Sequence, residues 1–302
     1  MTALIVVNPV TITDAMMTSS TVSEADYSTW SSATTYALGD KVIVLSTHKI
    51  YQSLQASNLN KSPLNQTLWW IEVSPTNKWA CLDTSVSTQT AQSTSISYTL
   101  TPGQAVNCLA ALNLTNATSM SISMSSALGG GVVFTKTVDL SAVPVYSTWW
   151  EWFYGSKITP SQSVNVDLPS YVDGVITVTI SGGTSLALGV LMIGQQRSFG
   201  LGLQYGSRLG ILDYSRKETD DYGETVLVQR AFAKRANFDL VIEKYETDQL
   251  NKFLAEVRAT PVLWIGSDGY ESTTIFGFYK SFDIVISYAE RSDCSIEIEG
   301  LT

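Results

Sequence analysis

Five aromatic side chains in the front part of the chain have the types and spacing to bind sugars. A flat tryptophan or tyrosine ring on a surface stacks on the C–H face of a sugar ring, while nearby amides bind the sugar hydroxyls. The set consists of Trp30, Tyr36, Tyr51 and the adjacent pair Trp69 and Trp70. Neighbouring residues of a strand point to opposite faces, so we expect one member of the adjacent pair to be exposed.

The same rings have an alternative role as core residues. A module of about 50 residues needs large aromatic side chains to bury enough apolar area. Core packing is the favoured role for Trp30 and Tyr36. The two roles are close to balanced for Tyr51, Trp69 and Trp70, which are therefore the candidate carbohydrate-binding residues.

Composition argues against several other kinds of site. The net charge of −9 and the isoelectric point near 4.6 disfavour nucleic-acid binding, because the chain cannot neutralise a run of phosphates. The sole histidine, His48, excludes multi-histidine zinc sites. Three distant cysteines, Cys81, Cys108 and Cys294, imply no disulfide framework. We predict no cofactor and no metal.

The densest acidic group has two interpretations, a calcium loop or a solvated or ion-paired loop. Its spacing lacks the alternating ligands, central glycine and terminal glutamate of a calcium loop. Arg216 and Lys217 are interleaved with the acids, which favours ion pairing. The acids are Asp213, Glu218, Asp220, Asp221 and Glu224.

The apolar runs of the chain are short. The first nine residues lack the basic region and the length of a secretory signal, and the run Leu186–Ile193 is far below the roughly 20 residues that span a bilayer. We therefore expect no membrane insertion. We expect a protein made in the cytoplasm that stays there or leaves the cell by a route other than secretion.

Charge density predicts the domain organisation. Residues 1–196 hold 6 Lys/Arg and 10 Asp/Glu, whereas residues 197–302 hold 12 and 17. A second change, from an aromatic segment to a Ser/Thr-rich one, lies near residue 80. We therefore predict domains at 1–80, 81–196 and 197–302.

Apolar periodicity predicts a mainly β fold behind a small aromatic N-terminal module. The middle domain alternates like an antiparallel β-sandwich or jelly roll. The rear domain reads as a β-sheet or barrel with one α-helix over about residues 247–260, capped by Thr247 or Asp248. The predicted strands are 95–100, 106–112, 119–124, 132–140, 163–168, 175–180, 186–193, 226–228, 238–242, 262–265, 273–279, 282–288 and 295–299.

A second aromatic group occupies residues 149–154, Trp-Trp-Glu-Trp-Phe-Tyr. Read as a strand, it is either buried on both faces between domains or an exposed contact strip for a partner subunit or a glycan. We favour packing against a subunit.

The front aromatic pattern resembles a known module. Trp30, the run Tyr36-Ala-Leu-Gly-Asp-Lys-Val42, Tyr51 and the pair Trp69-Trp70 occur in the order seen in small chitin-binding-type carbohydrate-binding modules. The resemblance covers roughly residues 27–74. It implies the fold of such a module and a role in binding glycans.

The rear of the chain resembles structural proteins of tailed bacteriophages. The resemblance rests on residues 213–223, 230–236, 259–266 and 296–301. The order of strand, helix and Pro261-Val-Leu-Trp264 also resembles the ring-forming domain of phage distal tail and tail-hub proteins.

This second resemblance implies a component of a virion tail, tail hub or baseplate that assembles in the host cytoplasm. Its implied partners are further copies of itself, in a ring or other homo-oligomer, other tail proteins and a host-surface glycan. The alternative is a polysaccharide- or cell-wall-degrading enzyme with an accessory binding module. That alternative lacks a recognisable acid/base pair, so we predict a protein that is not an enzyme. A head-surface decoration protein is a minor third interpretation.

Overall fold

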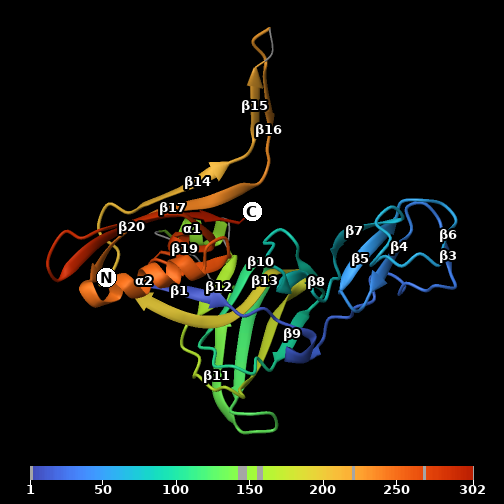
Figure 1. Ribbon diagram of the computed structural model, residues 1–302, viewed down its shortest axis with the longest axis horizontal. Coiled ribbons are helices and arrows are strands. Elements are labelled where there is room, and N and C mark those ends of the chain that lie inside the picture. Colours follow the sequence, from blue (N-terminus) through green and yellow to red (C-terminus); the bar gives the residue numbers. More distant parts are fainter. Residues whose placement is uncertain (1–2, 142–147, 155–158, 220–221, 268–269, 302) are drawn as a thin grey trace. The chain divides into compact units, whose positions relative to one another are not determined.

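The chain is mainly β, as its sequence predicts (Figure 1). The computed structural model describes residues 3–141, 148–154, 159–219, 222–267 and 270–301. Strands pair antiparallel in the large sheet, and the longest helix among these residues has 13 residues.

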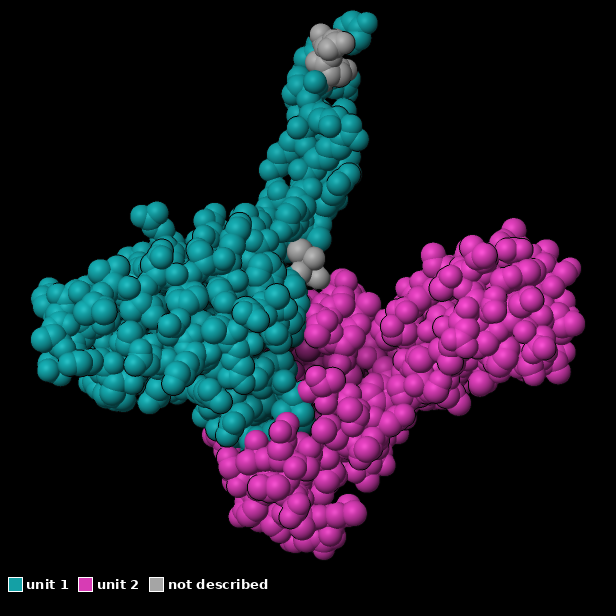
Figure 2. Space-filling model, viewed as in Figure 1, with its two compact units in different colours: residues 1–10, 106–108, 193–302 teal, residues 11–105, 109–192 magenta. Residues whose placement is uncertain are grey.

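The chain divides into two compact units (Figure 2). Unit 1 comprises residues 1–10, 106–108 and 193–302, and unit 2 comprises residues 11–105 and 109–192. The longest segment of unit 1 thus begins at residue 193, close to the predicted boundary at 197. The first ten residues belong to this rear unit, although we assigned them to the front domain, because their apolar strand pairs within the rear sheet.

Unit 1 is an antiparallel sheet with one helix packed on it. Its strand order is β13, β1, β18, β19, β20, β17 and β14. The bounds are β1 (Leu4–Pro9), β13 (Val175–Phe199, whose last residues lie in this unit), β14 (Arg208–Asp213), β17 (Phe232–Glu243), β18 (Val262–Ile265), β19 (Thr274–Val285) and β20 (Arg291–Gly300). The 3₁₀ helix η3 (Glu271–Thr273) precedes β19.

Helix α2 (Lys244–Glu256) covers the core of unit 1. Leu250, Phe253 and Leu254 are buried there, at the spacing that predicted a helix. They share one core cluster with Phe238 and Trp264 of the sheet. The apolar stripe therefore holds the helix against the sheet.

The start of α2 differs from our prediction. The helix begins at Lys244, and Glu243 is its N-cap in place of Thr247 or Asp248. The Glu246 carboxylate accepts the Glu243 backbone N–H at 3.5 Å. This capping contact stabilises the N-terminal end of the helix, so the helix begins before Thr247.

Unit 2 contains the middle strands and the aromatic module. The middle strands are β2 (Met17–Ser20), β8 (Thr90–Gln92), β9 (Ser95–Leu100), β10 (Cys108–Ser125), β11 (Val132–Asp139), β12 (Gln162–Asn165) and most of β13. Ile96, Tyr98 and Leu100 of β9 alternate inward with more polar neighbours. This alternation is the period of two that predicted the strand.

Two pairs of predicted middle strands are single long strands. Residues 108–112 of the predicted strand 106–112 and residues 119–124 fall in β10, and residues 175–180 and 186–193 fall in β13. Gly182 and Gly183 do not turn the chain, because both hydrogen-bond to the backbone of Thr94. A Cβ on Gly182 would lie 2.2 Å from the Asn116 carbonyl oxygen. The glycine therefore allows the backbones of β13 and β10 to approach each other closely here.

The aromatic module has two small sheets. Strands β4 (Lys41–Val44), β5 (Lys49–Ser53) and β7 (Trp70–Pro75) form one, and β3 (Thr35–Tyr36) and β6 (Asn58–Leu59) form the other. A Gly-Asp turn precedes β4. Gly39 has a φ of +91°, and the Asp40 carboxylate accepts the Ala37 N–H at 2.7 Å. The 3₁₀ helices η1 (Asp14–Met16) and η2 (Ala80–Leu82) lie on either side of the module in the sequence.

Candidate functional site

Two of the three predicted carbohydrate-binding residues lie in the core of the module. Tyr51 is 8% exposed and Trp70 is 2% exposed. The Trp70 ring meets the Tyr36 ring edge-on, with 5.2 Å between centroids, and its Nε1 donates to the Lys61 carbonyl oxygen at 2.8 Å. A sugar needs an open ring face, so Tyr51 and Trp70 are corrected to core residues.

Trp69 differs from its neighbour. It is half-buried, packs against the cluster from outside, and the Lys61 Nζ lies 5.4 Å from its ring centroid. The two adjacent tryptophans therefore divide between core and surface, but not through strand alternation, because Trp69 lies in the turn before β7, which begins at Trp70. Tyr36 is buried as expected, and Trp30 is half-buried against the same cluster. Sugar binding by Trp69 stays a prediction.

The open surface of the module contains an aromatic residue that sequence reasoning did not single out. Tyr27 is 41% exposed, and the Lys41 Nζ lies 5.6 Å from its ring centroid. It borders a hollow of about 610 Å³ whose polar lining includes Thr34, Thr35 and Asp40. An exposed ring beside hydroxyls and a carboxylate offers the two kinds of contact, apolar stacking and hydrogen bonding, that sugars use. The local sequence does not mark Tyr27 as a candidate, because the exposure of its ring is a property of the folded chain.

The sole histidine lies between two carboxylates. His48 Nδ1 is 2.9 Å from Glu24 Oε1, and His48 Nε2 is 2.9 Å from Asp14 Oδ2. The Thr76 hydroxyl also donates to Glu24 at 2.9 Å. Among the described residues, no nucleophile completes this arrangement as a catalytic triad. The contacts of His48 instead connect segments of the chain that are distant in the sequence.

The second aromatic group is helical, contrary to the predicted strand. Helix α1 (Trp149–Tyr154) begins next to Thr148, whose hydroxyl accepts the Glu151 N–H at 3.3 Å. Burial on both faces is also wrong, because every residue of α1 is exposed, with Trp149 at 79%. The alternative of an exposed contact strip stays a prediction.

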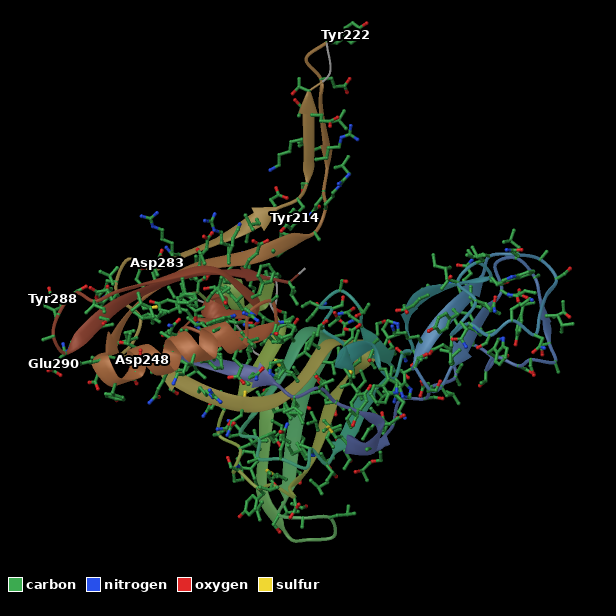
Figure 3. The ribbon with its side chains drawn as sticks, viewed as in Figure 1. Tyr214, Tyr222, Asp248, Asp283, Tyr288 and Glu290 are labelled. Carbon is green, nitrogen blue, oxygen red and sulfur yellow. The ribbon has the colours of Figure 1, made fainter. Side chains whose placement is uncertain are left out.

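The rear unit carries a long hairpin, which we call the arm and define as residues 214–231. It continues the β14–β17 pair into β15 (Arg216–Thr219) and β16 (Thr225–Val228), which pair only with each other among the described residues. Figure 3 shows Tyr214 at the base of the arm and Tyr222 at its tip.

The arm is apolar along one strand and charged along the other. In β16, Val226, Leu227 and Val228 are 53%, 70% and 44% exposed. In β15, Arg216 pairs with Glu218, and Lys217 pairs with Asp213 of β14 at 2.7 Å.

The ion pairs of the arm decide between the two interpretations of the acidic group. The hydrogen bond from Lys217, followed by those from Ser215, holds the pKa of Asp213 well below its usual range. The ion-paired interpretation is therefore confirmed for Asp213 and Glu218, while Asp220 and Asp221 lie outside the described residues.

A hollow of about 410 Å³ lies at the other end of β14. The loop of residues 203–207 forms one wall, and it is anchored because the Gln204 N–H donates to the Asp239 carbonyl at 2.7 Å. Leu203, Leu209 and Phe238 give the hollow an apolar lining, with Tyr205 and Tyr270 exposed beside them.

Metal-binding clusters and membrane-spanning helices are both absent from the described residues. In the described ranges, three or more His, Cys, Asp or Glu side chains do not gather where they could hold a metal ion. Helices long and apolar enough to cross a bilayer are likewise not found in the part of the chain that the structure describes. Comparison with protein-family models finds no match, and comparison with curated proteins finds no similar sequence.

Proposed function

We propose that this chain is a structural subunit of a bacteriophage tail, tail hub or baseplate. It assembles with copies of itself and with other tail proteins in the host cytoplasm and becomes part of the virion. Its aromatic module contacts a glycan on the host surface during adsorption. The proposal requires no catalysis, cofactor, nucleic acid or membrane insertion.

The exposed arm is the observation that carries the assembly part of the proposal. A lone two-stranded hairpin is at best marginally stable in water. The arm nevertheless exposes Val226, Leu227 and Val228. Residues of this kind favour strands in which one face of the sheet is packed against other side chains. Exposed apolar residues that are continuous along an edge strand favour pairing with another chain. An assembly of copies gives these side chains a partner.

The phage part of the proposal rests on the sequence resemblance. Three of its four segments coincide with strands of the unit 1 sheet: residues 230–236 enter β17, residues 259–266 contain β18, and residues 296–301 contain the end of β20. The fourth, residues 213–223, covers the first half of the arm. The resemblance therefore concentrates in the unit that carries the arm, which supports an assembly role for that unit.

The glycan part is supported by the surface of the module. Trp69 keeps part of its ring exposed, and Tyr27 borders a hollow lined by hydroxyl groups. One stacked aromatic ring contributes about 1 kcal/mol, so a single module binds weakly. Many copies in one assembly raise the strength of attachment through multivalency.

Light scattering coupled to size-exclusion chromatography tests assembly. We expect the full chain to form oligomers of defined size. Replacing residues 214–231 by Asn-Gly joins the paired residues Asp213 and Phe232 through a two-residue hairpin turn, and we expect a folded monomer. The matched control replaces the exposed β10–β11 loop, residues 126–131, by the same turn and retains the oligomer. A monomeric full chain would overturn the proposal.

Retention on insoluble chitin and on bacterial cell envelopes tests the glycan role. We expect Tyr27→Ala and Trp69→Ala each to weaken retention while the protein stays folded. Unchanged retention in the double variant would remove the glycan part. Release of reducing sugar or peptidoglycan fragments by the purified protein would overturn the non-enzymatic role in favour of the degrading-enzyme alternative.

A further inference from the structure

The two aromatic rings that are proposed to stack on sugar each have an ammonium group beside them. The Lys41 Nζ lies 5.6 Å from the centroid of the Tyr27 ring, and the Lys61 Nζ lies 5.4 Å from the centroid of the Trp69 ring. Both lysines are half-buried, so their packed stems hold the ammonium groups near the rings. The aromatic module thus presents two platforms of one kind, each made of a flat ring and a positive charge.

The charges of these two platforms are not neutralised by carboxylates. The module, residues 27–74, contains three lysines and no arginine, and its third lysine, Lys49, forms an ion pair with Glu72 at 2.7 Å. Ion pairs of Lys41 and Lys61 are not found among the described residues. A cation beside an aromatic ring is attracted to the ring but keeps its charge. Two positive charges of the module therefore remain for an anion to bind.

The carboxylate next to Lys41 in the sequence has a role of its own. Asp40 lines the same hollow as Tyr27, and its Oδ2 accepts the Ala37 N–H at 2.7 Å in the turn before β4. A carboxylate also has a second oxygen, which can accept a hydrogen bond from a sugar hydroxyl. The hollow therefore offers hydrogen bonds to the neutral part of a sugar and an ammonium group to a charged part.

The module also differs in charge from the rest of the chain. Its three lysines outnumber its two acids, Asp40 and Glu72, whereas the whole chain has a net charge of −9. Charges farther apart than about 8 Å are largely screened from each other at physiological ionic strength. The local excess of positive charge therefore decides which ligands the two platforms attract.

We infer that the glycan bound by the module is anionic. This inference rests on the proposed glycan role and names the chemical class of the ligand, a polysaccharide whose sugars carry carboxylate or phosphate groups. A sugar stacks on Tyr27 or Trp69, and its charged substituent binds the ammonium group of the neighbouring lysine. A neutral glycan such as chitin would leave both ammonium groups without an anion.

The charged contact has a measurable size. Hydrogen bonds to ionised groups are shorter and stronger than those between neutral groups. Loss of one such contact should lower the affinity by about threefold to tenfold. An effect of this size is large enough to separate charged from neutral ligands in a binding experiment.

The first experiment compares polysaccharides that share a backbone and differ in charge. The full chain is applied to agarose beads coupled to polygalacturonate or its neutral methyl ester, and to beads coupled to phosphomannan or neutral mannan. We expect tighter binding to the charged member of at least one pair, and weaker binding to it as the salt concentration rises. Preference in the first pair alone assigns carboxylate, preference in the second alone assigns phosphate, and preference in both assigns negative charge from either source.

The second experiment removes the positive charges one at a time. We expect Lys41→Gln and Lys61→Gln each to lower the affinity for the charged polysaccharide by about threefold to tenfold and to leave binding of its neutral partner unchanged. Lys41→Arg keeps the charge and should retain binding. The matched control is Lys49→Gln, which removes the same charge from the same module at a lysine already paired with Glu72. It should bind as the parent does, and circular dichroism checks that all four variants are folded.

The outcomes separate the inference from the proposed function. Equal binding of charged and neutral polysaccharides overturns the inference, as does parent-like binding by both Lys41→Gln and Lys61→Gln. The proposed glycan role still stands in either case if Tyr27→Ala and Trp69→Ala weaken retention. Equal losses in Lys41→Gln and Lys49→Gln would assign the effect to the overall charge of the module and also overturn the inference. Retention on none of the polysaccharides and on no cell envelope overturns both.

Discussion

The imidazole ring of His48 lies nearly parallel to the indole ring of Trp79, with 4.1 Å between centroids and 20° between planes. The carboxylates of Glu24 and Asp14 lie 2.9 Å from the two ring nitrogens, and the Thr76 N–H donates to the His48 carbonyl at 2.8 Å. One residue at the β4–β5 turn thus holds together segments from before and after the aromatic module.

We predict that His48→Ala weakens unit 2. The change removes a stacked ring pair and the polar contacts to Glu24 and Asp14, so the free energy of unfolding should fall by about 2 kcal/mol. Urea unfolding followed by circular dichroism measures the loss. Ser32→Ala, an exposed change in the same module, should leave the midpoint unchanged. Equal midpoints for both variants would show that His48 fastens nothing.

We predict opposite consequences for the two adjacent tryptophans. Trp70→Ala leaves a cavity beside Tyr36 and Val42 and should cost about 3–5 kcal/mol of stability. Trp69→Ala should cost clearly less, because its ring is half-buried at the edge of the cluster. Thermal unfolding of the two variants compares them directly. Equal losses would place both rings in the core.

We predict that stability falls at alkaline pH. Burial raises the pKa of the Cys81 thiol to about 11 and that of the Cys294 thiol to about 12. As the pH rises, the thiols of the unfolded chain lose their protons near their usual pKa of 9.0. The same thiols in the folded chain keep their protons to a higher pH. The stabilisation is therefore complete below about pH 9 and disappears as the pH rises through the folded pKa values.

Urea midpoints measured from about pH 8 to about pH 11 test this dependence. Cys294→Ala should flatten the decline, although its midpoint at neutral pH reports the lost packing as well. A decline that is the same in parent and variant would assign the pH dependence to other groups.

We predict that one glycine of the rear sheet tolerates no side chain and another does. A Cβ on Gly277 in β19 would lie 2.0 Å from the Glu299 carbonyl oxygen, so Gly277→Ala must displace backbone and should cost about 1–3 kcal/mol or more. Gly210→Ala in β14 meets nothing within 4 Å and should be close to neutral. Chemical denaturation of both variants gives the comparison. A neutral Gly277→Ala would contradict the packing of β19 on β20.

Local sequence patterns located most strands but not their ends. Val262–Ile265 is predicted and observed with the same bounds, because an apolar run there lies between Pro261 and Gly266. The merging of two predicted strands into β13 depends on Thr94, far away in the sequence, which bonds the glycines between them. Such long-range pairing leaves no mark in a local window.

The candidate site was harder to predict than the fold. Whether Tyr51 and Trp70 are covered depends on the pairing of β5 with β7, where Ser53 lies opposite Trp70. In α1, five of six residues are aromatic, so neither a period of two nor one of 3.6 is visible. The arm was recognised only as the strand 226–228, since its exposure is a property of the folded chain.

The path of the backbone between the two units has a consequence for biosynthesis. The chain crosses from one unit to the other four times, after residues 10, 105, 108 and 192. Strand β1 is translated before both of its partners, β13, which ends at Phe199, and β18, which ends at Ile265. The apolar run Leu4–Val7 must therefore wait about 190 residues for its first neighbour and more than 250 for its second, which makes this nascent segment a natural client for chaperones.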